Sequence, residues 1–189
     1  MLCDLDTING ILVGANTLIV AAIVLCGIAI GLNLNIFTFW SAPVAFGLAL
    51  TSGLTAELAL LPVTQMLASC SGSAGQCGQI ARDAATGFGV AAGFLAAGIG
   101  ASYLAIATSA VPVAGAFTMA VYATGLAIAS AFLFKAILIL RELQACLNVP
   151  APSTSTAVVL TGGAAVALSA ILIFAFFFAP GLNGSKKGG

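Results

Sequence analysis

Long apolar runs without charges, separated by short polar links, make up most of this chain. A helix that crosses a membrane needs about 20 apolar residues, because each residue adds about 1.5 Å across a hydrocarbon core of about 30 Å. The pattern predicts transmembrane helices over residues 8–32, 42–67, 81–110, 115–140 and 157–179. We therefore expect an all-α integral membrane protein, a single bundle of about five helices with short loops over residues 1–181, followed by a flexible polar tail over 182–189.

The polar residues at the helix ends predict where several helices begin and end. Thr7 is expected to cap the first helix, with Asp4 just outside it. The link at residues 33–35 is short, so the first two helices should be antiparallel neighbours. Pro180 is expected to stop the fifth helix. Asn16, inside the first run, is expected either to bond to another helix or to lie near the membrane interface.

The third run carries a stripe of small residues, four residues apart: Ala85, Gly89, Gly93, Ala97, Ala101, Ala105 and Ser109. Such stripes let helix backbones approach closely in lipid, so Gly89, Gly93, Ala97 and Ala101 are expected to form a helix-packing surface. A step of four residues advances about 400°, which favours a right-handed, close crossing. The glycine run GFGVAAGFLAAGIG resembles the glycine-zipper helices of the mitochondrial inner-membrane translocase and complex I accessory family. The resemblance covers one helix and implies no function for this chain.

Composition supports the membrane class and excludes several functions. The chain is 61% hydrophobic and 5% charged, whereas soluble domains carry about 25% charged residues. Its net charge is zero, so no basic patch is available for nucleic acid. Histidine is absent, which removes the commonest metal ligand and the usual general base. We expect neither catalysis nor a metal or cofactor.

Four of the five cysteines, Cys3, Cys70, Cys77 and Cys146, fall on one face of a five-span topology. An even number on one face favours disulfides in an oxidising compartment, so this face is expected to be extracellular, periplasmic or lumenal. We consider Cys70–Cys77 and Cys3–Cys146 pairs, but four cysteines allow three connectivities, and unpaired thiols are the alternative.

The basic residues near the ends of the apolar runs disagree about which side of the membrane each end of the chain occupies. Lys186 and Lys187 favour a cytoplasmic C-terminus, whereas Arg82 and Arg141 lie on the cysteine face and oppose it. We expect the C-terminus to be cytoplasmic.

Glu57 and Lys135 are the two charges deepest inside the predicted helices. An intramembrane charge is energetically unfavourable unless it is paired or hydrated. The second and fourth helices run in the same direction, so the two residues lie at comparable depth. Three interpretations remain open: a structural clamp, part of an ion or proton path, or snorkelling side chains without a pair.

These observations favour a non-catalytic multi-pass membrane protein that acts as a structural or accessory subunit. Its expected partners are the lipid bilayer and either other membrane subunits or further copies of itself. The alternative is a small channel or transporter that uses the Glu57/Lys135 pair. A third interpretation, an enzyme acting on a lipid or quinone, needs a pocket around Glu57, Arg82 or Arg141.

Overall fold

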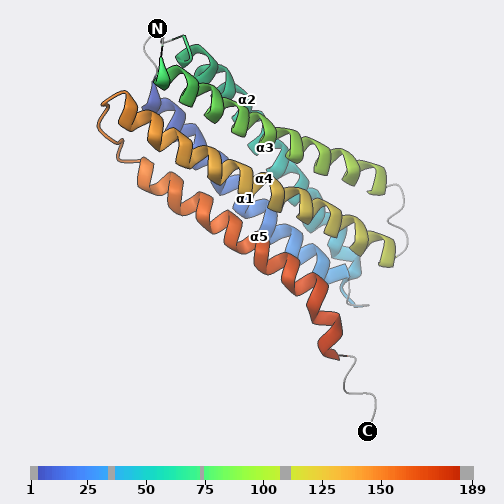
Figure 1. The fold of residues 1–189 in the computed structure, drawn as a ribbon. Coiled ribbons are helices and arrows are strands. Elements are labelled where there is room, and N and C mark those ends of the chain that lie inside the picture. Colours follow the sequence, from blue (N-terminus) through green and yellow to red (C-terminus); the bar gives the residue numbers. More distant parts are fainter. Residues whose placement is uncertain (1–3, 34–36, 73–74, 107–111, 184–189) are drawn as a thin grey trace.

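The computed structural model describes residues 4–33, 37–72, 75–106 and 112–183 and contains five long helices (Figure 1). They are α1 (Leu5–Asn33), α2 (Ala42–Cys70), α3 (Gln76–Ile106), α4 (Pro112–Cys146) and α5 (Ser155–Asn183), with a short 3-10 helix η1 (Phe39–Ser41) before α2. All five are long and apolar enough to cross a membrane, and no strand occurs among the described residues. The predicted all-helical, five-helix class is confirmed. The predicted tail lies, from residue 184 on, outside the described residues.

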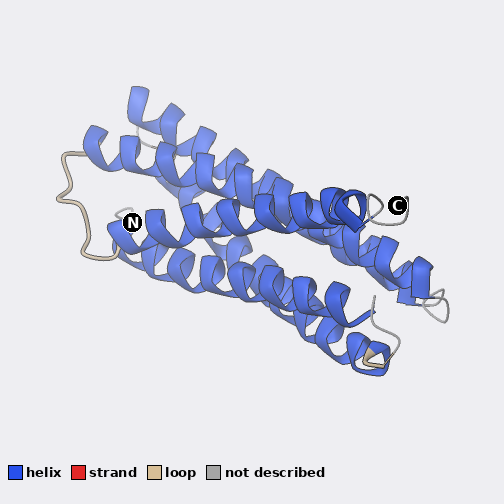
Figure 2. Ribbon diagram, turned by 90° about the horizontal axis from the view of Figure 1, so that it is seen from below, coloured by secondary structure: helices blue, strands red, loops and turns tan. Residues whose placement is uncertain are grey.

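The helices run up and down in sequence order and form one closed bundle (Figures 1 and 2). Each helix packs against the next along the chain, and α5 returns to α1, which also contacts α4. One end of the bundle carries Cys70, Cys77 and Cys146, and we call it the cysteine end. The start of α1 and the α4–α5 link lie at the same end, whereas α3 meets α4 at the opposite end (Figure 1).

Buried residues follow one spacing, alternately three and four residues apart. On α1 this series is Leu5, Ile8, Leu12, Ala15, Ile19, Ala22, Cys26 and Ala29, and Asn9, Asn16, Ile23 and Ile30 are buried beside it. On α3 they are Ala81, Ala84, Phe88, Ala91, Leu95, Gly98 and Ser102. An average step of about 3.5 residues is typical of left-handed coiled-coil packing. The buried face of α3 therefore follows this spacing and not the four-residue period of the small residues.

Three close approaches hold α3 and α4 in one antiparallel register: Cys77 with Cys146, Gly87 with Ala136, and Gly98 with Gly125. Gly87 and Ala136 each lie ten residues from the disulfide cysteine of their own helix. Gly98 and Gly125 each lie 21 residues from it. A Cβ added at Gly125 would be 3.2 Å from the Cα of Gly98, so the two backbones touch there. The register is kept over about 30 Å, at about 1.5 Å per residue.

The first helix begins earlier than expected, because Asp4 caps it and Thr7 does not. The Asp4 carboxylate accepts a hydrogen bond from the Thr7 backbone N–H (3.1 Å) and another from the Thr7 hydroxyl (2.6 Å). A carboxylate at this position also interacts favourably with the positive end of the helix dipole. Thr7 therefore lies in the first turn as the donor.

Two prolines lie inside helices. Pro62 lies on the exposed side of α2, which continues past it to Cys70. The expected stop at Pro180 is wrong, since α5 continues to Asn183. A proline removes one hydrogen bond from the helix, and apolar helices tolerate this loss when neighbouring groups satisfy the freed carbonyl.

We expect Gly87→Ala to destabilise the fold. The new Cβ would lie 2.8 Å from the Cβ of Ala136, so α3 and α4 must separate. Overpacking of this kind typically lowers the free energy of unfolding by about 1–3 kcal/mol. The matched control is Gly47→Ala on α2, where a Cβ meets nothing within 4 Å. Thermal unfolding in detergent, followed by circular dichroism, measures both; an equal effect of the two substitutions would contradict the register.

The cap predicts a pH dependence at the start of α1. The hydrogen bond from the Thr7 side chain, and then that from its backbone, hold the pKa of Asp4 below its usual value. Stabilisation by the cap is therefore complete above about pH 4 and is lost as the pH falls through the lowered pKa. Hydrogen exchange should show lower protection of the first turn below about pH 4 in the native protein. Asp4→Asn, a neutral cap, should not respond; the same response in both proteins would refute the prediction.

Candidate functional site

Glu57 lies near the middle of α2, thirteen residues before the helix ends. Its side chain is partly exposed, between the exposed Leu54 and Leu58. No hydrogen bond or ion pair joins it to any residue that the structure describes. The nearby hydroxyls of Thr51 and Thr55 donate to carbonyls of α2 itself. Glu57 is thus an acidic group at mid-helix for which the described part of the chain supplies no partner.

Lys135 is exposed on α4 and lines a groove of about 320 Å³ between α3 and α4. The acidic residue in this groove is Asp83 of α3, and Glu57 does not line it. The expected Glu57–Lys135 pair is therefore not formed within the chain, since α2 packs mainly against α1 and α3, and α4 packs mainly against α3 and α5. The channel or transporter alternative relied on that pair and stays a prediction.

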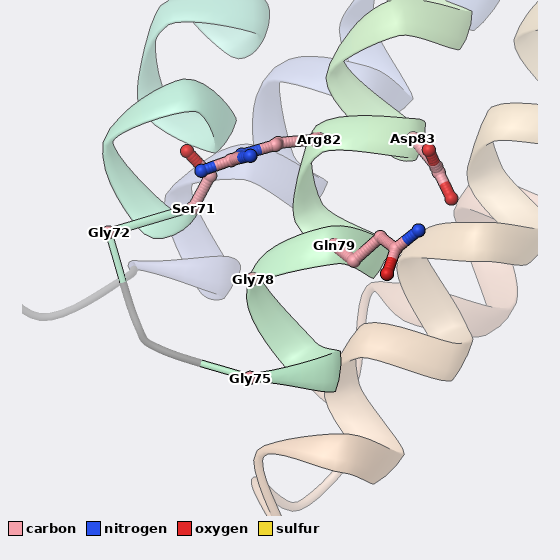
Figure 3. Close-up of a pocket in the computed structure, with 7 residues that line it drawn as sticks. All are labelled: Ser71, Gly72, Gly75, Gly78, Gln79, Arg82 and Asp83. Carbon is pink, nitrogen blue, oxygen red and sulfur yellow. The ribbon is translucent and has the colours of Figure 1, made fainter.

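A polar cavity of about 660 Å³ lies where α2 ends and α3 begins (Figure 3). Its lining residues are Ser71, Gly72, Gly75, Gly78, Gln79, Arg82 and Asp83. Arg82 extends from α3 towards Ser71, whereas Gln79 and Asp83 point to the other side of α3 (Figure 3). Lining groups of opposite charge and no nucleophile–base pair suit water or a polar headgroup better than catalysis. Arg141, on α4, does not line the cavity.

The stripe of small residues on α3 faces away from the bundle. Gly89, Gly93 and Ala97 are exposed, and Ala101 is half-buried. A Cβ added at Gly89 or Gly93 would meet nothing within 4 Å. The stripe is therefore not a packing surface between helices of one chain, because the residues that approach α4 lie on another side of α3. As a packing surface for another chain it remains a prediction.

Tyr122 forms a contact between α4 and α2 that the sequence pattern did not reveal. Its hydroxyl donates a hydrogen bond to the carbonyl of Ala49 (2.9 Å), and its ring meets Phe46 edge-on with centroids 5.7 Å apart. A Cβ at Gly53 would collide with the Tyr122 hydroxyl, so the glycine makes room for it. The contact between Gly53 and Tyr122 could not be predicted, because the two residues are far apart in the sequence and neither belongs to a recognisable motif.

Asn16 confirms the interhelical alternative. Its amide nitrogen donates to the carbonyl of Val158 (3.1 Å) and to the hydroxyl of Thr161 (3.2 Å), which joins α1 to α5. The side chain is fully buried, and its carbonyl oxygen has no hydrogen-bond partner. Its role is to hold two helices together.

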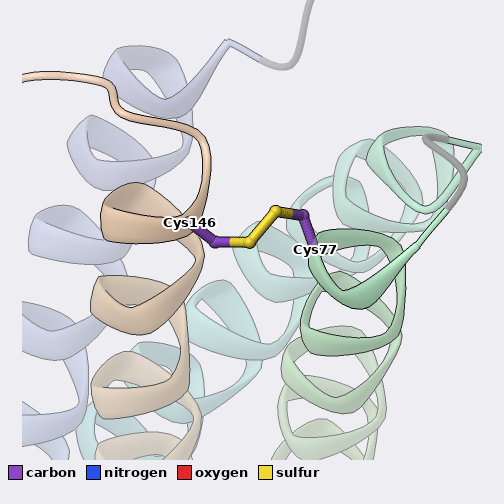
Figure 4. Close-up of a disulfide and its surroundings, with 2 residues drawn as sticks. All are labelled: Cys77 and Cys146. Atoms are coloured by element: carbon purple, nitrogen blue, oxygen red, sulfur yellow. A yellow bond between two sulfur atoms is a disulfide. The ribbon is translucent and has the colours of Figure 1, made fainter.

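Cys77 and Cys146 form a disulfide between the first turn of α3 and the end of α4, with Cα atoms 5.7 Å apart (Figure 4). Both pairings considered from the sequence, Cys70–Cys77 and Cys3–Cys146, are therefore wrong. Nearness along the chain suggested the first, but Cys77 faces α4 and not the end of α2. Cys70 is also disulfide-bonded, Cys26 is a buried free thiol, and Cys3 lies outside the described residues.

Among the described residues, no group of three or more histidine, cysteine or acidic side chains is placed to hold a metal ion. Comparison of the chain with protein-family models, with curated proteins and with solved structures found no match. The function must therefore be argued from the residues and their geometry.

Mass spectrometry of peptides digested without reduction should recover the Cys77 peptide linked to the Cys146 peptide. Cys146→Ser should expose Cys77 to maleimide after denaturation and lower the free energy of unfolding by about 2–4 kcal/mol, which is typical for the loss of a native disulfide. Cys26→Ala, at the buried free thiol, is the control and should leave the linkage intact. A Cys70–Cys77 linked peptide would show that the pairing is different.

Proposed function

We propose that this protein is a non-catalytic, multi-pass membrane subunit with a structural or accessory role in a homo-oligomer or a larger membrane complex. The observation that carries the proposal is Glu57, an acidic side chain at mid-helix without a partner in the described part of the chain. A charge at this depth costs at least about 2.5–3.5 kcal/mol in lipid unless it is paired or hydrated. Another polypeptide is the simplest source of a partner.

The shape of the chain supports the same proposal. The links between the described helices are short, so little polar surface is available outside the membrane for a soluble partner or substrate. The exposed large side chains are mostly apolar, as lipid or a neighbouring subunit requires. The described cavities bring together no nucleophile and base.

We further propose that the cysteine end lies on the extracellular, periplasmic or lumenal side, with the C-terminus in the cytoplasm. Disulfides persist in oxidising compartments, and the Cys77–Cys146 bond lies at this end. Maleimide labelling of a cysteine introduced on each side of the membrane in intact cells distinguishes the two orientations.

Extraction in a mild detergent tests the subunit proposal. The protein should migrate as an oligomer, or together with other membrane proteins, when its mass is measured by light scattering after gel filtration. Chemical cross-linking in the native membrane before extraction controls for dissociation by the detergent. A stable monomer in both measurements, with no partner, would refute the proposal.

A further inference from the structure

Glu57 and Lys135 lie on α2 and α4, the two helices that pack against α3. Glu57 follows Gly53 by one turn of α2, and Gly53 faces Tyr122 of α4, whose ring also lies against Gly98 of α3. Glu57 therefore lies at the edge of the buried face of α2, about 40° further round the helix than Gly53. Lys135 lies in the groove between α3 and α4.

The two charges also lie at similar depth. The register of α3 with α4 places Lys135 level with Phe88, since each lies eleven residues from its disulfide cysteine. Glu57 lies thirteen residues before the end of α2, which a short link joins to the start of α3. At about 1.5 Å per residue, both charges are about 15–20 Å from the cysteine end and within about one helical turn of each other.

The outer face of α3 between these charges is flat. It is formed by the exposed Gly89, Gly93 and Ala97, and a Cβ at either glycine would meet nothing within 4 Å. Arg82, near the start of α3, extends towards Ser71 over the end of α2 (Figure 3), and Phe94, which follows Gly93, stacks on Phe132 of α4. Another helix can therefore approach the α3 backbone closely, as small-residue faces permit in membranes.

Two copies related by a two-fold axis that runs along the membrane normal in front of α3 would give both charges a partner of opposite sign. Rotation by 180° brings the α4 flank of one copy opposite the α2 flank of the other and leaves depth unchanged. We propose that the partner is a second copy of this chain: α3 packs against α3, and Glu57 of each copy pairs with Lys135 of the other. The inference rests on the proposed function, because it names the partner of such a subunit and the surface that binds it.

Charge complementarity is the argument for a second copy. One chain exposes one acidic and one basic group at this depth, on the two helices that pack against α3. A symmetric dimer converts these four charges into two ion pairs, whereas an unrelated partner would need the same arrangement by coincidence. Asp83 is the acidic residue of the same chain that shares a groove with Lys135. It lies five residues nearer the cysteine end than Phe88, which is level with Lys135, and it forms no ion pair with Lys135.

The test uses two differently tagged full-length chains, co-expressed and purified through one tag. Native chains should copurify. Glu57→Lys alone, or Lys135→Glu alone, should reduce copurification at least tenfold, because like charges then face each other. A Glu57→Lys chain mixed with a Lys135→Glu chain should recover it, since every pair is again of opposite charge. Asp83→Asn is the control and should associate as the native chain does.

Folding is monitored in each variant by the Cys77–Cys146 disulfide in non-reduced digests. As an independent measurement, Gly93→Cys in a Cys26→Ser background should form a disulfide-linked dimer on mild oxidation, because equivalent residues meet at the axis. Leu160→Cys, exposed on α5, should not. Self-association that survives both single charge reversals, or a mixture that fails to associate, overturns this interface and leaves the subunit proposal standing. Native chains that bind neither each other nor another protein overturn both.

Discussion

The close approach of α3 to α4 is the constraint on which the rest of the bundle depends. Gly98 and Gly125 let the two backbones touch, and Gly87 leaves room for Ala136. A Cβ at Gly87 would collide with Ala136, and one at Gly125 would press against the Cα of Gly98. The same register holds from the disulfide to the glycine contact, and α3 and α4 share the most extensive helix–helix interface among the described residues.

Hydrogen bonds to main-chain carbonyls supply specificity inside this apolar bundle. Asn16 bonds to α5, and the Tyr122 hydroxyl of α4 bonds to α2. The thiol of Cys26 on α1 lies 3.4 Å from the carbonyl of Met119 on α4. Lipid tails are as apolar as leucine, so burial of apolar surface discriminates poorly between alternative helix pairings in a membrane. Polar contacts between specific helices exclude those alternatives.

The sequence was sufficient for the number and rough extent of the helices, because the length of an apolar run is a local property. The sequence was insufficient to predict which side of each helix is buried in the bundle. The small stripe through Gly89 and Gly93 is the most regular pattern in α3, but the buried residues follow the interleaved spacing through Phe88 and Leu95. Both patterns are apolar, and in a membrane protein lipid and core select for nearly the same residue types, so polarity does not separate the outside from the inside.

The charges and the cysteines show the same limit for the candidate site. Similar depth suggested that Glu57 meets Lys135, but Lys135 lies in the groove between α3 and α4, which Glu57 does not line, and the lateral order of helices is a property of the assembled bundle. The pairing of Cys77 likewise follows from the side of α3 on which it lies, which only the register with α4 determines. Depth is encoded along the chain, whereas direction around each helix is decided by tertiary packing.

The position of the Cys77–Cys146 bond has a consequence for biogenesis. Its two cysteines stand at the beginning of α3 and at the end of α4, so the bond spans the whole hairpin. In a chain that spans the membrane as proposed, both thiols would reach the same side only after both helices have entered the membrane in the correct sense. A chain whose fourth helix stalls or inverts keeps one thiol on the wrong side and cannot be oxidised at this site. In the proposed orientation, the disulfide would therefore form only in chains whose third and fourth helices have both been inserted.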